Sequence, residues 1–198
     1  LLARQVLSER KGATIIADVK ASRALFEEVS RLGGRPLMWK TGHSLIKAKM
    51  AETGAELAGE MSGHLFFKER WYGFDDGLYA GARLLEIVSR AVNPSAILEA
   101  LPDAVSTPEL QIKLKEGENY ALIDKLHKTA RFEGARDVIT IDGLRVEYPD
   151  GFGLMRPSNT TPVIVMRFEA DTEEALRRIQ MSFRKILLSE RPGLELPF

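Results

Sequence analysis

The chain contains no cysteine, which excludes disulfide frameworks, thiolate zinc sites and cysteine nucleophiles. Neither charge is in excess, because Lys plus Arg and Asp plus Glu each number 28, so no overall field attracts the protein to nucleic acid or anionic membranes. No apolar run reaches the roughly 18 residues of a transmembrane helix, and the first residues lack the charge order of a signal peptide. We therefore expect a cytoplasmic protein whose partners are neither nucleic acid nor membrane.

The composition of the 198 residues, 44% hydrophobic and 28% charged, is typical of a globular protein with one or two domains. Residues 1–7 are predicted to be helical without a capping residue ahead of them, which suggests that the natural chain begins earlier. From residue 13 to residue 60, short apolar segments alternate with helical patterns in the order strand, helix, strand, helix, strand. This order predicts a three-layer α/β/α domain over residues 1–103, with a largely parallel sheet whose ligands bind at the carboxyl ends of the strands.

Residues 104–198 have a different pattern, and the proline-rich segment 102–108 is the expected boundary. Strands are predicted at 110–115, 137–141, 144–148, 152–156 and 163–169, with a hairpin turn at Asp142-Gly143 and a helix over 119–130. The last helix is expected to begin with a capping box of Asp171 and Glu174. Its apolar stripe should pack on the sheet and comprises Leu176, Ile179, Phe183, Ile186 and Leu187. The pattern predicts a smaller α+β domain with an antiparallel sheet.

The segment GEMSGH, residues 59–64, follows the third predicted strand and combines a carboxylate, a hydroxyl and an imidazole around two glycines. Glu60 could accept hydrogen bonds from two neighbouring sugar hydroxyls, and Ser62 could donate or accept another. The alternative is a tight loop whose glutamate caps a nearby amide. The position at the end of a parallel strand favours the binding role.

Three further side chains lie at predicted strand ends. Lys20 directly follows an apolar strand, where its ammonium suits proton transfer or phosphate contact; the alternative is a solvated loop lysine. His43 and His64 lie on two different loops of the same sheet edge, and imidazole suits acid–base chemistry near neutral pH, although isolated histidines are more often structural. His127, in an amphipathic helix, is expected to be structural.

In the second domain, residues 156–162 read RPSNTTP and connect two predicted strands. A guanidinium, hydroxyls, an amide and backbone donors are the groups that bind phosphate. The alternative is a turn that satisfies itself through local hydrogen bonds. No acidic cluster has the spacing of a magnesium site, and Asp75-Asp76-Gly77 is interpreted as the N-cap of the following helix.

Taken together, Lys20 after ADV, His43 in WKTGHS, the GEMSGH segment and the RPSNTTP loop resemble the third and fourth domains of bacterial phosphomannomutase/phosphoglucomutase, of the α-D-phosphohexomutase family. The resemblance runs in order over essentially the whole chain. It implies a sugar-recognition domain over residues 1–103, in which Glu60 and Ser62 bind hexose hydroxyls, and a phosphate-binding domain over residues 104–198. Acid–base and phosphate-orienting roles are implied for Lys20, His43 and His64. Contacts to the phosphate that is not transferred are implied for Arg156, Ser158, Asn159 and Thr160.

Two motifs of that family do not occur in these residues: the TASHNP-like loop of the phosphorylated serine and the DGDGDR-like loop that holds Mg²⁺. The resemblance therefore implies the C-terminal half of a four-domain enzyme, which interconverts hexose 1-phosphate and hexose 6-phosphate (mannose or glucose) through a phosphoserine and a hexose 1,6-bisphosphate. Its partners would be these sugar phosphates and the missing N-terminal domains. This half alone is expected to be inactive. The alternative is a free-standing, non-catalytic phosphosugar-binding protein.

Overall fold

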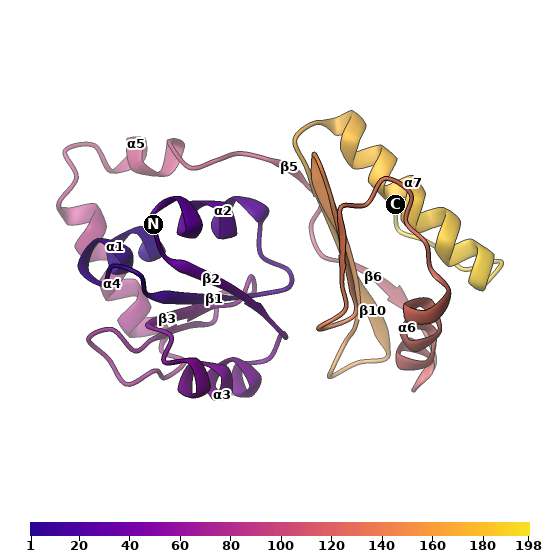
Figure 1. Cartoon of the computed structure of the whole chain (residues 1–198), viewed down its shortest axis with the longest axis horizontal. Coiled ribbons are helices and arrows are strands. Elements are labelled where there is room, and N and C mark those ends of the chain that lie inside the picture. The colour runs from indigo at the N-terminus through magenta and orange to yellow at the C-terminus, as the bar shows by residue number, and fades with distance from the viewer. The chain divides into compact units, whose positions relative to one another are not determined.

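The computed structural model describes residues 1–198, which divide into two units, Leu1–Asp103 and Ala104–Phe198 (Figure 1). The sheet of the first unit has the strand order β2-β1-β3-β4. β1 (Thr14–Asp18) pairs in parallel with β2 (Arg35–Trp39) on one side and with β3 (Leu57–Gly59) on the other. β4 (Leu65–Phe67) adds an antiparallel edge. All five residues of β1 are buried, and its central residues Ile15, Ile16 and Ala17 place apolar side chains on both faces of the sheet.

Helices cover both faces of this sheet. α1 (Leu2–Glu9), α2 (Arg23–Arg31) and α4 (Gly77–Ser89) share one apolar cluster with Ile15, and α3 (His43–Thr53) packs on the opposite face against Ile16. Figure 1 shows α2 and α3 on opposite sides of the strands. The alternation of side chains along β1 sends neighbouring isoleucines into two separate cores, which produces the three layers.

Side-chain caps fix where the helices of the first unit begin. Ser22 accepts a hydrogen bond from the amide of Ala24 at 3.2 Å, and Asp76 accepts one from Tyr79 at 2.9 Å. α5 (Pro94–Glu99) begins in the same way, with Asn93 as cap and a proline in its first turn. This helix was not predicted from the sequence, although the Asn-Pro pair is typical of a helix start.

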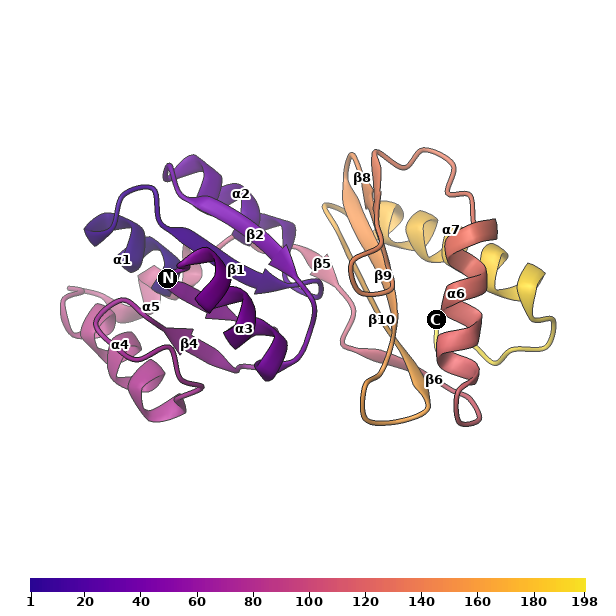
Figure 2. The same cartoon turned by 60° about the horizontal axis from the view of Figure 1, so that its bottom comes forward.

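The second unit contains an antiparallel sheet in the order β5-β10-β9-β8-β7, and β6 also pairs with β10. Its strands are β5 (Val105–Ser106), β6 (Leu110–Lys113), β7 (Asp137–Ile139), β8 (Leu144–Tyr148), β9 (Gly151–Pro157) and β10 (Val163–Ala170). α6 (Glu118–Thr129) and α7 (Glu173–Glu190) lie together on one face of this sheet, as Figure 2 shows. This face holds the single core of the unit.

The apolar stripe predicted on the last helix packs on the sheet. Phe183 meets Phe168 edge-on at 5.2 Å between ring centroids, and it occupies the space where a side chain on Gly153 would stand. The predicted capping box is wrong in its first residue: Thr172, not Asp171, accepts the hydrogen bond from the amide of Ala175, at 3.2 Å. Asp171 instead donates its backbone amide to the carbonyl of Asp150.

The expected fold class, an α/β/α domain followed by an α+β domain with an antiparallel sheet, is confirmed by these two sheets. Two short strands were not predicted, β4 and β5, because three and two residues are too few to show a periodicity. No helix of the chain is long and apolar enough to cross a membrane.

Replacing Phe183 by Ala should lower the free energy of unfolding of the second unit by about 3–5 kcal/mol, because the change empties the centre of its only core. Hydrogen exchange of core amides in α7 and β9 measures this loss. Met181, two residues away on the same helix and 61% exposed, supplies the control. If Met181→Ala destabilised the unit as much as Phe183→Ala, the assigned packing face of α7 would be wrong.

Candidate functional site

The loops that follow β1, β2 and β3 lie at one edge of the first sheet. Asp18, the last residue of β1, is in register with Trp39, the last residue of β2, and Ala17 is in register with Gly59, the last residue of β3. Because the three strands are parallel, their carboxyl ends meet at the same edge. The structure thus brings together the loops that carry three predicted site residues, Lys20, His43 and Glu60.

Glu60 lies in a tight turn that links β3 to the antiparallel β4. The amide of Glu60 donates to the carbonyl of His64, and the amide of Gly63 donates to the carbonyl of Glu60, both at 2.9 Å. Gly63 has a φ of 95°, which favours glycine. The strand after this loop is antiparallel, so GEMSGH is a hairpin loop as well as the end of a parallel strand.

The Glu60 side chain is nearly buried, and its carboxylate accepts hydrogen bonds from two nearby residues. Its Oε1 accepts from the amide of Gly42 at 2.5 Å, and its Oε2 accepts from the hydroxyl of Ser62 at 3.2 Å. Gly42 is the N-cap of α3, so this carboxylate also lies at the positive end of a helix. The amide-capping role considered from the sequence is present, and the same carboxylate and hydroxyl lie at the sheet edge where ligands of such folds bind.

His43 and His64 lie close together, with ring centroids 6.3 Å apart. Nδ1 of His64 is 2.7 Å from Oδ2 of Asp75. Asp75 is held beside β4 by a backbone bridge to Phe66. A carboxylate at Nδ1 fixes the ring orientation and leaves Nε2 as the nitrogen that exchanges a proton.

The interpretation of Asp75-Asp76-Gly77 as a helix cap is therefore correct only for Asp76. Asp75, its neighbour, partners His64. The loop that presents Asp75 is anchored by a buried ion pair, with Nη1 of Arg83 2.7 Å from Oε2 of Glu69. Sequence spacing gave no signal for the histidine–aspartate pair, since the two residues are brought together by the turn after β4.

Asp18 is fully buried and contacts all three loops of the edge. Its carboxylate accepts from the hydroxyl of Thr41 at 3.2 Å and from the amide of Met61 at 3.3 Å, and it lies 3.7 Å from Nζ of Lys20. Burial raises the pKa of Asp18 above its ordinary value, and the ammonium of Lys20 opposes this shift. Sequence reasoning named Lys20 and missed Asp18.

In the second unit, Arg156 lies on β9 and donates from Nε to Oδ2 of Asp142 at 2.9 Å. Asp142 reaches this position because Gly143 turns with a φ of 80°, where a Cβ would stand 2.3 Å from the carbonyl of Met155. His127 lies 2.9 Å from the carbonyl of Gly143 through Nε2, a structural contact. Nη2 of Arg156 is buried without a hydrogen-bond partner, which is costly for a guanidinium unless an anion binds there.

The loop after β9 is organised by Ser158. The Ser158 hydroxyl accepts from the amides of Thr160 and Thr161, both at 3.3 Å, and its carbonyl accepts from the hydroxyl of Tyr120 at 3.2 Å. The self-satisfying turn considered from the sequence is therefore present. These amide contacts are long, so an anion with shorter bonds can compete for the same donors.

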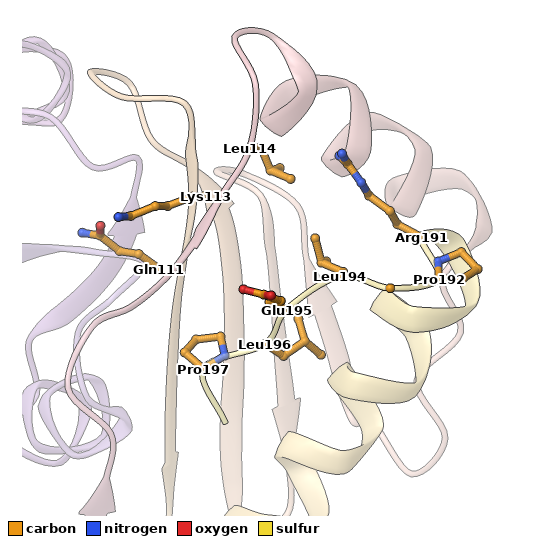
Figure 3. Close-up of a pocket in the computed structure, with 10 residues that line it drawn as sticks. Gln111, Lys113, Leu114, Arg191, Pro192, Leu194, Glu195, Leu196 and Pro197 are labelled. Atoms are coloured by element: carbon orange, nitrogen blue, oxygen red, sulfur yellow. The ribbon is translucent and has the colours of Figure 1, made fainter.

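A cavity of about 730 Å³ lies elsewhere in the second unit, between β6 and the segment 191–197 (Figure 3). None of the predicted site residues lines it. Its main cation, Arg191, is already paired with Glu118 at 2.9 Å, and the side chains of Gln111 and Lys113 point away from Arg191 in Figure 3. We therefore base the candidate site on the strand-end loops rather than on this cavity.

The two units match two consecutive domains of one enzyme family. Residues 1–105 match phosphoglucomutase/phosphomannomutase, alpha/beta/alpha domain III, and residues 109–186 match the phosphoglucomutase/phosphomannomutase C-terminal domain. The chain belongs to the phosphoglucomutase/phosphomannomutase family, as the sequence motifs indicated. It comprises the third and C-terminal domains of that family.

Among its relatives, a phosphoglucomutase of Neisseria meningitidis is 59% identical over 198 residues, and a phosphomannomutase/phosphoglucomutase of Pseudomonas aeruginosa is 55% identical over 199 residues. In each case the match covers 100% of this chain and 43% of the relative. A solved family protein from Burkholderia thailandensis is 65% identical, with a TM-score of 0.93 over 99% of this chain and 42% of that chain. The chain thus spans less than half the length of the relatives it matches.

Magnesium does not fit the residues of this chain. No group of three or more His, Asp or Glu side chains is arranged to hold a metal ion. The acidic residues of the candidate site are each engaged with protein groups: Asp18 with Thr41 and Met61, and Asp75 with His64. We assign no metal-dependent step to these residues.

The raised pKa of Asp18 predicts a pH-dependent stability. The folded protein holds the proton of this carboxyl more tightly than the unfolded chain, whose Asp pKa is about 3.9. The contribution of Asp18 to the free energy of unfolding is therefore greatest below about pH 4 and falls as pH rises through the folded pKa. Asp18→Asn should lose this dependence.

Urea unfolding between about pH 4 and pH 7, followed by tryptophan fluorescence, measures the difference between wild type and Asp18→Asn. Both tryptophans, Trp39 and Trp71, lie in the first unit, so the signal reports that unit. Asp103→Asn removes an exposed carboxylate and serves as control. The wild type should lose stability relative to Asp18→Asn as pH rises, and a wild type that gained stability relative to the variant would contradict the assigned direction of the Asp18 pKa.

Proposed function

We propose that this chain is the recognition half of a phosphohexomutase that interconverts hexose 1-phosphate and hexose 6-phosphate of glucose or mannose. The observation that carries the proposal is the cluster at one edge of the first sheet, where a carboxylate, a hydroxyl, an ammonium and two imidazoles come together in a chain of this family. These groups suit a polyhydroxylated anion better than an apolar ligand.

Sugar recognition is assigned to Glu60 and Ser62. An ionised carboxylate is the strongest acceptor for two neighbouring hydroxyl groups, and the turn of residues 60–64 holds it rigidly. Because two neighbouring hydroxyls of a hexose form a nearly symmetric pair, one carboxylate can accept hydrogen bonds from them in either orientation of a bisphosphate. Either epimer at carbon 2 is compatible with such a contact.

Phosphate recognition is assigned to the loop after β9, with Arg156, Ser158, Asn159 and Thr160. Its support is the buried Nη2 of Arg156, a donor without an acceptor in the chain. Asp142 binds Nε of the same guanidinium and so directs the remaining N–H groups. This phosphate would be the one that is not transferred, which requires a fixed anchor rather than a reactive group.

Acid–base chemistry is assigned to Lys20, His43 and His64. In the forward half-reaction the sugar hydroxyl must lose a proton while its oxygen attacks phosphorus of the donor phosphoserine, and the serine oxygen leaves. His64 is the strongest candidate for that proton because Asp75 contacts Nδ1 and orients the ring. Lys20 would offset charge on the phosphosugar from the neighbouring loop.

The phosphoserine and the magnesium ion of the whole enzyme would come from domains outside these 198 residues. The bisphosphate would reorient, return its other phosphoryl group to the serine and leave as the isomeric monophosphate. A free-standing phosphosugar-binding protein would keep the same recognition groups. The upstream reading frame distinguishes the two: the mutase requires a serine loop and an acidic metal loop there.

In the full-length enzyme, Arg156→Ala should lower kcat/KM by an amount equivalent to about 2–4 kcal/mol of transition-state binding, because a charge-assisted phosphate anchor is lost. A coupled assay of glucose 1-phosphate and mannose 1-phosphate conversion measures the effect. Arg177→Ala, an exposed arginine on α7, is the control and should leave kcat/KM unchanged. Unchanged kcat/KM in Arg156→Ala would remove the assignment of the phosphate loop.

A further inference from the structure

Asp18 stands out as a buried charge that none of the assigned roles uses. The other four residues of β1 are Thr, Ile, Ile and Ala, and Asp18 ends the strand with no exposed surface. A carboxylate in such a place costs free energy unless it is paired and hydrogen-bonded. Its contacts are spread over three separate loops: Lys20 after β1, Thr41 after β2 and Met61 after β3.

The two hydrogen bonds of Asp18 lie on either side of the contact that holds the Glu60 carboxylate. Thr41 precedes Gly42, and Met61 follows Glu60. The amide of Gly42 and the carboxylate of Glu60 are themselves hydrogen-bonded. Asp18 therefore holds the neighbouring residue on each side of the Gly42–Glu60 contact, while the ammonium of Lys20 lies 3.7 Å away.

We propose that Asp18 is the positioning residue of this site: its carboxylate fixes Glu60 and Lys20 relative to each other and does not touch the ligand. The inference rests on the proposed function for the identity of the ligand, and on the hydrogen bonds alone for the positioning. A carboxylate has two acceptor oxygens in one plane, which suits two donors on separate loops. Neither a serine nor an aliphatic side chain could replace both contacts.

The first test needs no ligand and uses the 198-residue chain. Asp18→Asn keeps the shape but removes the negative charge and one of the two acceptor oxygens, so the hydrogen bonds from Thr41 and Met61 are weakened and the ammonium of Lys20 loses this carboxylate. In Asp18→Asn, amide hydrogen exchange at Gly42 and Met61 should become about tenfold faster than in the wild type. This acceleration should exceed any that the core amides of β1 show. The proposal would be overturned if the exchange rates at both amides changed only as much as those of the core amides of β1.

Thr41 allows a second variant that leaves the buried charge in place. Thr41→Val removes the hydroxyl donor and should release Gly42 as Asp18→Asn does, whereas Thr41→Ser should restore slow exchange. Adding Thr41→Val to Asp18→Asn should have little further effect, because both act through one contact. Thr53→Val, on the far end of α3, is the matched control. Fully additive effects of the two changes at Gly42 would contradict a shared role.

The second test measures binding of glucose 1-phosphate and of inorganic phosphate to the same proteins. Asp18→Asn should weaken glucose 1-phosphate binding about tenfold and weaken inorganic phosphate binding much less, since inorganic phosphate does not need Glu60. Equal glucose 1-phosphate affinity in wild type and variant would overturn the positioning role. If the wild type bound no glucose 1-phosphate, the proposed function of this chain as a recognition half would be wrong. The hydrogen-exchange rates at Gly42 and Met61 would still decide whether Asp18 positions the loops.

Discussion

The parallel pairing of β1 with both β2 and β3 is the constraint on which the candidate site depends. It places the last residues of three strands at one edge, so that side chains separated by some forty positions in sequence meet there. Beyond this edge each strand continues into a loop. Asp18 connects those loops through hydrogen bonds, and the Glu60 carboxylate adds a hydrogen bond to the N-terminus of α3.

In the second unit, side chains of the candidate site are also held by residues from other elements, but the sheet is antiparallel. Its strands are antiparallel, so a functional loop is simply the turn between two neighbours, here β9 and β10. Arg156 is aimed by Asp142 from the β7–β8 turn, and Ser158 is held by Asn119 and Tyr120 at the start of α6. Each of these proposed recognition groups is thus supported by residues from another element, which suits a preorganised binding site.

The sequence was informative where local pattern decides the outcome. Apart from α5, β4 and β5, the strand and helix order of both units followed from periodicity and turn residues, and Asp76 was identifiable as part of a helix cap. The Thr172 cap was not, because Asp171 and Thr172 are both good caps and only the backbone path decides between them. The short strands β4 and β5 were not predicted, because they are defined by pairing with β3 and β10 and not by a pattern in their own residues.

For the candidate site, sequence motifs supplied the groups that we propose contact a ligand, and the structure added residues that position them. Asp18, Asp75 and Asp142 each orient a residue named from its motif: Lys20, His64 and Arg156. These pairings join positions 2, 11 and 14 apart with no shared periodicity. Only the turns after β1, after β4 and before β8 bring them together, so no spacing rule could have found all three.

The most direct test of the account is a titration of the 198-residue chain with glucose 1-phosphate and mannose 1-phosphate, followed by amide NMR, with mutase activity assayed in the same sample. We predict shifts confined to residues 60–64 and 156–161 and their supporting loops, from both sugars, without turnover. Shifts that cluster at the 191–197 cavity while those loops stay unchanged would contradict the recognition site. Conversion of either sugar phosphate by this chain alone would contradict the assignment of the phosphoryl donor to other domains.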